Sequence, residues 1–140
     1  MSPRVSKRLL QVTVAILALI PTLTGAAGIL VGPAFLTGEA PAAANLDSHL
    51  RFLSGTFFAV GLAFYATLPS IERKGALFRL AAALVFTGGL ARLISLCAVG
   101  TPAWPHLAGL GMELAVVPLL VVWQGRVARA FGKQEGGTQS

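Results

Sequence analysis

The stretch LLQVTVAILALIPTLTGAAGILVGPAFL, residues 9–36, decides the fold class of this chain. It carries no charged side chain, and it is longer than the roughly 20 apolar residues that a helix needs to cross a membrane. Pro21 interrupts the run, and Gly32 and Pro33 lie near its end. We therefore predict a transmembrane helix over residues 9–36.

Three later runs, at residues 48–68, 77–99 and 106–124, are also predominantly apolar, and their only charged residues are Arg51, Arg79, Arg92 and Glu113. None alternates with period two as a membrane strand does, and backbone groups in lipid must be satisfied within each segment. The sequence thus predicts an all-α integral membrane protein, a four-transmembrane-helix bundle forming a single domain over residues 1–131. The polar, glycine-rich segment 132–140 is predicted to be a disordered cytoplasmic tail.

The composition supports this class over a soluble one. Hydrophobic residues make up 55% of the chain and charged residues 11%, whereas soluble domains carry about 25% charged residues. The net charge is +6, but the cations form short clusters beside apolar runs and do not interleave with aromatic residues as nucleic-acid sites require. We expect the lipid bilayer as the main partner and no nucleic acid.

The cations also predict the orientation of the helices. The linkers that follow the first and the third predicted helices contain no Lys or Arg, whereas the opposite side of the bundle is basic. The positive-inside rule places the basic side in the cytoplasm. This gives cytoplasmic N- and C-termini (N-in/C-in) and favours a bacterial inner membrane. Nine cations fall on that side: Arg4, Lys7, Arg8, Arg73, Lys74, Arg79, Arg126, Arg129 and Lys133.

A cleaved signal peptide is the alternative interpretation of the first run. Arg4 to Arg8 resembles its basic region, and the small residues after Pro21 resemble a cleavage site. The apolar run continues through Ile29 and Phe35, which a cleaved signal does not need. We expect the first helix to be retained.

The sequence indicates no metal site and no cofactor. The single cysteine, Cys97, lies in an apolar run, and no Cys/His spacing is typical of metal binding. No nucleophile, zinc or phosphate-loop motif is present. Small residues spaced by four allow close helix contacts and oligomerisation, at Gly28 and Gly32, Gly55 and Ala59, and Gly111 and Ala115.

Apart from the nine cations, six charged or histidine side chains lie within the apolar runs or at their ends, and all map to the outer half of the bundle. Asp47 and Arg51 are one helical turn apart, and His49 points to another face. The full set comprises Asp47, His49, Arg51, Arg92, His106 and Glu113. We predict that Asp47, His49, Arg51, Arg92 and Glu113 bind a ligand. The alternatives are solvation at the interface for His49, as is expected for His106, and an N-cap role for Asp47.

Arg92 and Glu113 are predicted to pair. Both lie roughly 10 Å below the outer membrane boundary, on the third and fourth helices. A lone charge at that depth costs at least about 2.5 kcal/mol, and pairing removes much of the cost. Gly88 and Ser95 share a stripe with Arg92, and Pro118 is expected to distort the fourth helix near Glu113.

Three functions fit these charges. The first is binding or carrying a small or lipid-like ligand in an outward-facing polar pocket, with an anionic group that suits arginine. The second is an enzyme acting on a lipophilic substrate, with Glu113 or Asp47 as acid or base and Arg92 holding an oxyanion. The third is a structural or assembly subunit whose charges are packing pairs.

Four segments together resemble a known family. DSHLRFLSG at residues 47–55 and GGLARLIS at 88–95 are followed by GTPAWP at 100–105 and ELAVVPLLVVWQ at 113–124. In this order they are similar to the bacterial membrane family called domain of unknown function 4345. The resemblance covers residues 9–130 and implies a four-helix membrane protein, but no reaction or substrate.

Overall fold

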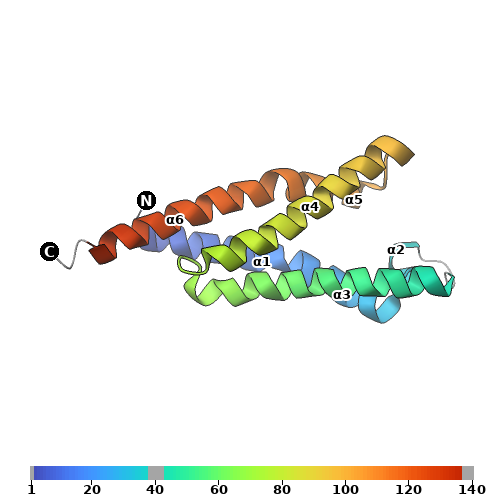
Figure 1. Ribbon diagram of the computed structural model, residues 1–140, viewed down its shortest axis with the longest axis horizontal. Helices are drawn as coiled ribbons and strands as arrows, with labels where there is room; N and C mark the ends of the chain where they lie inside the picture. Colours follow the sequence, from blue (N-terminus) through green and yellow to red (C-terminus); the bar gives the residue numbers. More distant parts are fainter. Residues whose placement is uncertain (1, 38–42, 137–140) are drawn as a thin grey trace. The chain divides into compact units, whose positions relative to one another are not determined.

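The structure, a computed structural model, describes residues 2–37 and 43–136 (Figure 1). All regular elements in these two ranges are helical, and four helical segments are long and apolar enough to cross a membrane. The helical fold class is therefore confirmed. In chain order the elements are α1 (Pro3–Val31), α2 (Ala34–Thr37), α3 (Ala44–Thr67), the 3-10 turn Leu68–Ser70, α4 (Gly75–Val99), α5 (Trp104–Gly111), the π-helical turn Met112–Val116 and α6 (Val117–Gly136).

Several helix ends differ from the prediction. The first helix covers Pro3–Val31 and not residues 9–36, because Gly32 turns the chain before Pro33. The last helix continues to Gly136, beyond residue 132 where the tail was expected to begin, and residues 137–140 lie outside the described residues. Hydropathy marks where apolar side chains end, whereas a helix continues through Lys, Arg and Gln, which are good helix formers.

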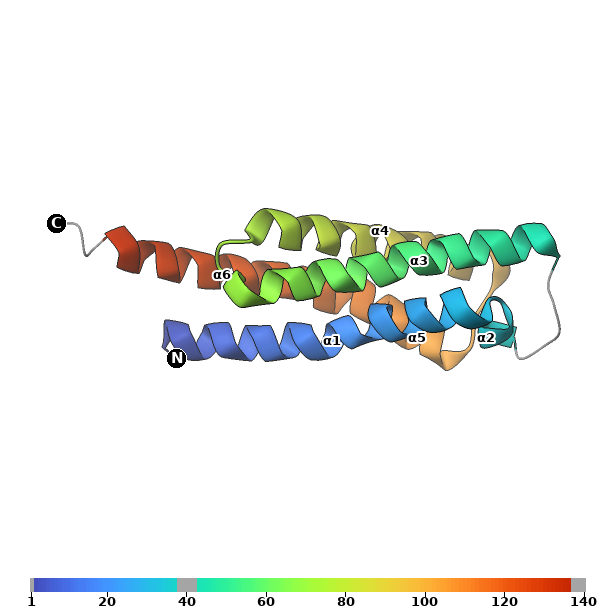
Figure 2. The same cartoon turned by 90° about the horizontal axis from the view of Figure 1, so that it is seen from below.

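The chain divides into two compact units. The central unit is Thr13–Ala66, and the terminal unit combines Met1–Val12 with Thr67–Ser140. In the central unit, α1 and α3 run antiparallel (Figure 2). The Tyr65 hydroxyl donates a hydrogen bond to the Ala15 carbonyl at 2.9 Å, and a Cβ added to Gly25 would lie 2.6 Å from the Phe58 nitrogen. The two helices therefore approach backbone to backbone at Gly25.

In the terminal unit, α4 packs along α6 (Figure 1). Its buried side chains include Phe78, Ala81, Leu120 and Val127. Buried Gln124 donates a hydrogen bond to the carbonyl of Ile71 at 2.8 Å, which ties the turn before α4 to α6.

The first turns of α1 belong to the terminal unit and lie beside the second half of α6. The Trp123 indole donates a hydrogen bond to the Ser6 hydroxyl at 2.9 Å. Lys7 forms an ion pair with Glu72 at 2.8 Å, and its ammonium lies 5.3 Å from the centre of the Phe131 ring. These contacts bring three chain segments together at one end of the unit.

Candidate functional site

The Arg92–Glu113 pair predicted from equal depth is present in the terminal unit. The Nε of Arg92 in α4 lies 3.2 Å from Oε1 of Glu113 in the π-helical turn. The Glu113 side chain is 10% exposed and that of Arg92 is 41% exposed. The pair thus joins a buried carboxylate to a guanidinium that reaches the surface.

A local distortion of the helix positions Glu113. The N–H of Val117 bonds to the carbonyl of Met112, five residues back, which is the π-helical pattern. Pro118 follows, and its ring lacks an N–H and would clash with the carbonyl of Leu114 in a regular α-helix. The distortion expected at Pro118 is therefore present as a π-helical turn, a feature that is frequent at functional sites.

Gly89 brings α4 close to this turn. A Cβ at Gly89 would lie 2.8 Å from the Glu113 Cβ and 2.8 Å from a methyl group of Leu114. A Cβ at Gly88, which the sequence singled out, would have open space within 4 Å. The glycine that makes room for the pair is thus the neighbour of the one predicted.

His106 completes the cluster. Its Nδ1 lies 3.1 Å from Nη1 of Arg92, so this half-exposed ring has a side-chain partner that the sequence did not predict. The two described contacts of Arg92 use Nε and Nη1 of a guanidinium that carries five N–H donors. A cavity of about 170 Å³ adjoins these side chains and is lined by Arg92, Ser95, Leu96, Pro102, His106 and Leu110.

The carboxylate of Glu113 has unused hydrogen-bonding capacity. Its Oε2 atom is buried and has no hydrogen-bond partner among the described residues. A buried acceptor without a partner costs roughly 1–3 kcal/mol, more when charged. The cluster therefore offers both an unused acceptor and exposed donors.

Arg51 and Asp47 form a separate pair in the central unit. The Arg51 Nε donates a hydrogen bond to Oδ2 of Asp47 at 2.8 Å, and both side chains are partly exposed. The Arg51 Nη1 also donates to the carbonyls of Ile29 and Leu30 at the end of α1. The last carbonyls of a helix lack partners within the helix, and a cation there is favourable.

Gly32 provides the space for this arrangement. Its φ is +68°, the left-handed conformation that often ends a helix, and its N–H donates to the Gly28 carbonyl at 3.0 Å. A Cβ at Gly32 would lie 2.5 Å from the Asp47 carboxylate and 2.8 Å from the Arg51 guanidinium. Arg51 thus caps the end of α1 and pairs with Asp47 at the same time.

The five predicted ligand-binding residues are divided between the two units. Arg92 and Glu113 lie together in the terminal unit, Asp47 and Arg51 lie together in the central unit, and His49 is exposed on α3. Across the part of the chain that the structure describes, no group of three or more His, Cys, Asp or Glu side chains could hold a metal ion.

A family model described as Domain of unknown function (DUF4345) matches residues 9–124. The matched region includes Arg92, Glu113 and the whole cavity next to them. No curated protein and no solved structure matches the chain.

Proposed function

The chain belongs to the DUF4345 family, and we propose that it is a multi-pass membrane protein that binds a lipophilic ligand at the Arg92 cluster. This cluster comprises Arg92, His106 and Glu113. The observation that carries the proposal is the position of Arg92, which contacts Glu113 and His106 and lines the 170 Å³ cavity with part of its guanidinium exposed.

The surface of the helices supports insertion in a membrane. Large apolar side chains are exposed on each long helical segment, including Leu30 (78%), Phe52 (70%), Ile94 (70%) and Leu119 (68%). Soluble proteins rarely expose apolar surface on this scale. With the basic side in the cytoplasm, we place both termini inside a bacterial cell and the Arg92 cluster toward the outer face of the inner membrane.

The size of the cavity indicates how such a ligand would bind. Pockets that enclose a whole drug-sized molecule measure about 300–1,000 Å³, so 170 Å³ suits a small head group only. Leu90, Leu93 and Ile94 are exposed on the same helix as Arg92. The head group would therefore occupy the cavity while an apolar chain lies along α4 in the bilayer.

The charges of the cluster define the head group further. Arg92 and Glu113 neutralise each other, and Arg51 is paired as well, so neither arginine is left without a carboxylate. The ligand thus needs oxygen atoms that accept hydrogen bonds from Arg92 more than it needs a full negative charge. A carboxyl group meets this requirement and suits the planar guanidinium fork.

Titration of the purified protein in detergent with oleic acid tests the proposal. 1-Octadecene is the matched probe because it has the same chain length and no head group. We expect oleic acid to bind at least about 10-fold more tightly, since hydrogen bonds to charged groups contribute roughly 1.5–3 kcal/mol. Arg92→Gln should abolish the preference, and Arg79→Gln on the same helix should keep it. Equal binding of both probes by the wild type would contradict the proposal.

The unpaired oxygen of Glu113 supports a second function, an enzyme that uses this carboxylate as acid or base. Glu113 does not line the cavity, so a substrate would have to reach past Arg92 to its buried free oxygen, where the carboxylate could take a proton while the guanidinium stabilises the resulting oxyanion. Mass spectrometry of lipids incubated with the protein separates the two functions. Conversion of a lipid that Glu113→Gln abolishes indicates an enzyme, and unchanged lipids indicate a binding protein.

A further inference from the structure

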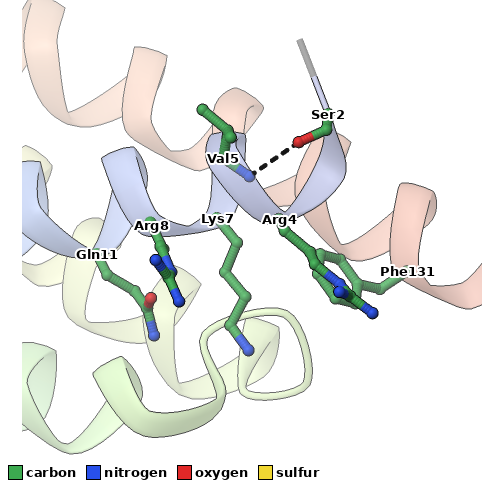
Figure 3. A pocket seen from close by; sticks show the side chains of 7 residues that line it. All are labelled: Ser2, Arg4, Val5, Lys7, Arg8, Gln11 and Phe131. Atoms are coloured by element: carbon green, nitrogen blue, oxygen red, sulfur yellow. Dashed lines mark hydrogen bonds between the residues drawn. The ribbon is translucent and has the colours of Figure 1, made fainter.

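A second cavity lies in the terminal unit at the start of α1 (Figure 3). Its volume is about 610 Å³, within the range of ligand pockets. Arg4, Lys7, Arg8 and Gln11 extend into it from α1, and Phe131 comes from α6 (Figure 3). Ser2 and Val5 complete the lining.

The cavity has an excess of positive charge. Three cations line it, and among the described residues no acidic side chain does. Lys7 is balanced by Glu72 at 2.8 Å, and its ammonium is also held over the Phe131 ring at 5.3 Å. Arg4 and Arg8 are exposed, and no described carboxylate pairs with either. The site therefore carries about two uncompensated positive charges next to a fixed ammonium.

From this geometry we propose that the cavity binds the phosphate group of an anionic membrane lipid. Two arginines can each make bidentate hydrogen bonds to phosphate, and Lys7 adds a point charge. Gln11 supplies a polar amide beside them, although its Nε2 already donates to the carbonyl of Leu68. The exposed apolar side chains of Leu9 and Val12 on the next turn of α1 offer a surface for acyl chains. The inference rests on the proposed membrane insertion but not on the Arg92 cluster.

Native mass spectrometry of the full chain in detergent, titrated with phosphatidylglycerol, measures this binding. Phosphatidylcholine is the zwitterionic control. Each cation near an anionic lipid is worth about fivefold in affinity, so the double variant Arg4→Gln, Arg8→Gln should bind phosphatidylglycerol about 30-fold more weakly. The single variant Arg4→Gln should bind phosphatidylglycerol about fivefold more weakly. Because Arg4 is exposed, this variant should fold and keeps the test valid if the double variant unfolds.

The matched control removes the same charge elsewhere. Arg126 and Arg129 lie on α6 and do not line the cavity. The affinity of the double variant Arg126→Gln, Arg129→Gln for phosphatidylglycerol should therefore fall by less than about threefold. Equal losses in both double variants, or equal binding of the two lipids by the wild type, would overturn the proposal.

A second arm separates a lipid from a soluble anion. Inorganic phosphate is added to the lipid-free protein, and its unfolding temperature is measured. No stabilisation by phosphate, together with tight binding of phosphatidylglycerol, supports a lipid site. Stabilisation of the wild type but not of the Arg4→Gln, Arg8→Gln variant would overturn the lipid assignment in favour of a soluble phosphate. Oleic acid binding by that variant reports on the Arg92 cluster separately, so either proposal can fail alone.

Discussion

The Arg92 guanidinium has two partners that differ in burial. Glu113 is nearly enclosed, whereas His106 is partly exposed beside the cavity. The Glu113 contact compensates a charge that would otherwise be buried alone, and the His106 contact joins the guanidinium to a second residue of the cavity wall. One side chain therefore serves both helix packing and the proposed binding.

Truncation of the pair should reveal their coupling. Arg92→Ala and Glu113→Ala should each lower the unfolding temperature in detergent, because each leaves one partner uncompensated. Breaking a buried pair costs about 3–5 kcal/mol, and hydrogen bonds in membrane proteins average near 0.6 kcal/mol, so we expect a loss between these limits. The double variant should cost less than the sum of the single variants. Strictly additive losses would show that the residues do not interact.

Two adjacent glycines of α4 give a sharper steric test. Gly89→Ala places a methyl group 2.8 Å from Glu113 and Leu114, and overpacking of this kind costs about 1–3 kcal/mol. Gly88→Ala meets no neighbour and should gain up to about 1 kcal/mol from helix propensity. The unfolding temperatures of the two variants should therefore shift in opposite directions from that of the wild type. A shift of the same sign in both would show that α4 is packed differently.

The charge pair, the neighbouring Ser95 and the distortion at Pro118 could be predicted from the sequence, whereas the contact of His106 with Arg92 and the close approach at Gly89 could not. Arg92 and Glu113 could be matched because each has a depth that follows from its distance to a helix end. His106 could not be placed, because it follows the loop at residues 100–103, whose path does not follow from hydropathy. The choice of Gly89 over Gly88 depends on the rotation of α4, which its nearly uniform apolar surface leaves open.

Between elements, the closest approach of α1 and α3 depends on small residues. Gly25 faces the backbone of Phe58 and Ser54, and Gly61 faces Thr22. Such contacts are typical of membrane helices, which gain stability from close van der Waals packing. Gly55, which also belongs to a pair of small residues in the sequence, makes no such close contact, because a Cβ built on it would have open space around it.

Alanine at Gly25 should weaken the central unit. The added methyl group would lie 2.6 Å from the Phe58 nitrogen and 2.8 Å from the Ser54 carbonyl, and backbone atoms cannot move aside as a side chain does. We expect Gly25→Ala to cost about 1–3 kcal/mol and Gly55→Ala to be neutral or slightly stabilising. Chemical unfolding in mixed micelles measures both. Equal effects of the two substitutions would contradict the packing of α1 on α3.

The existence of the four apolar helices was predictable because each apolar run is about as long as a bilayer-spanning helix needs to be, but the exact ends of the helices were not. The turn after α1 depends on the left-handed Gly32 and on Arg51 at the α1 carbonyls, a contact between residues far apart in sequence. Pro118 did signal a distorted helix, although the sequence could not specify a π-helical turn.

For the whole molecule, the Lys7–Glu72 pair predicts how stability depends on pH. Burial raises the pKa of Glu72, but the hydrogen bond and charge of Lys7 outweigh it, so the pKa lies below its usual range. A depressed pKa means that this stabilisation is present above about pH 4.3 and is lost as the pH falls through the lower folded-state value. The unfolding temperature of the wild type should therefore drop below about pH 4. The unfolding temperature of Glu72→Gln should be lower than that of the wild type at about pH 7 and should fall less on acidification. Parallel pH profiles of the unfolding temperature in the two proteins would exclude this role of the Lys7–Glu72 pair.

The orientation of the chain remains a prediction that reporter fusions can test. A reporter inserted at Gly75, and another at the C-terminus, should be active only as cytoplasmic reporters, because the nine cations lie on that side. A reporter at Ala43 should report the outer face. A cytoplasmic signal at Ala43 would reverse the side to which the Arg92 cluster faces.

Exchange of the two charges tests the central claim, that Arg92 binds a head group and does not serve packing alone. The double variant Arg92→Glu, Glu113→Arg keeps an ion pair but moves the guanidinium from the cavity wall to the π-helical turn. The measurement is its affinity for oleic acid relative to 1-octadecene, taken on protein whose unfolding temperature exceeds that of both single alanine variants. We predict that the preference for oleic acid is lost although stability is largely restored. A swapped variant that regains stability and keeps the full preference would contradict the account.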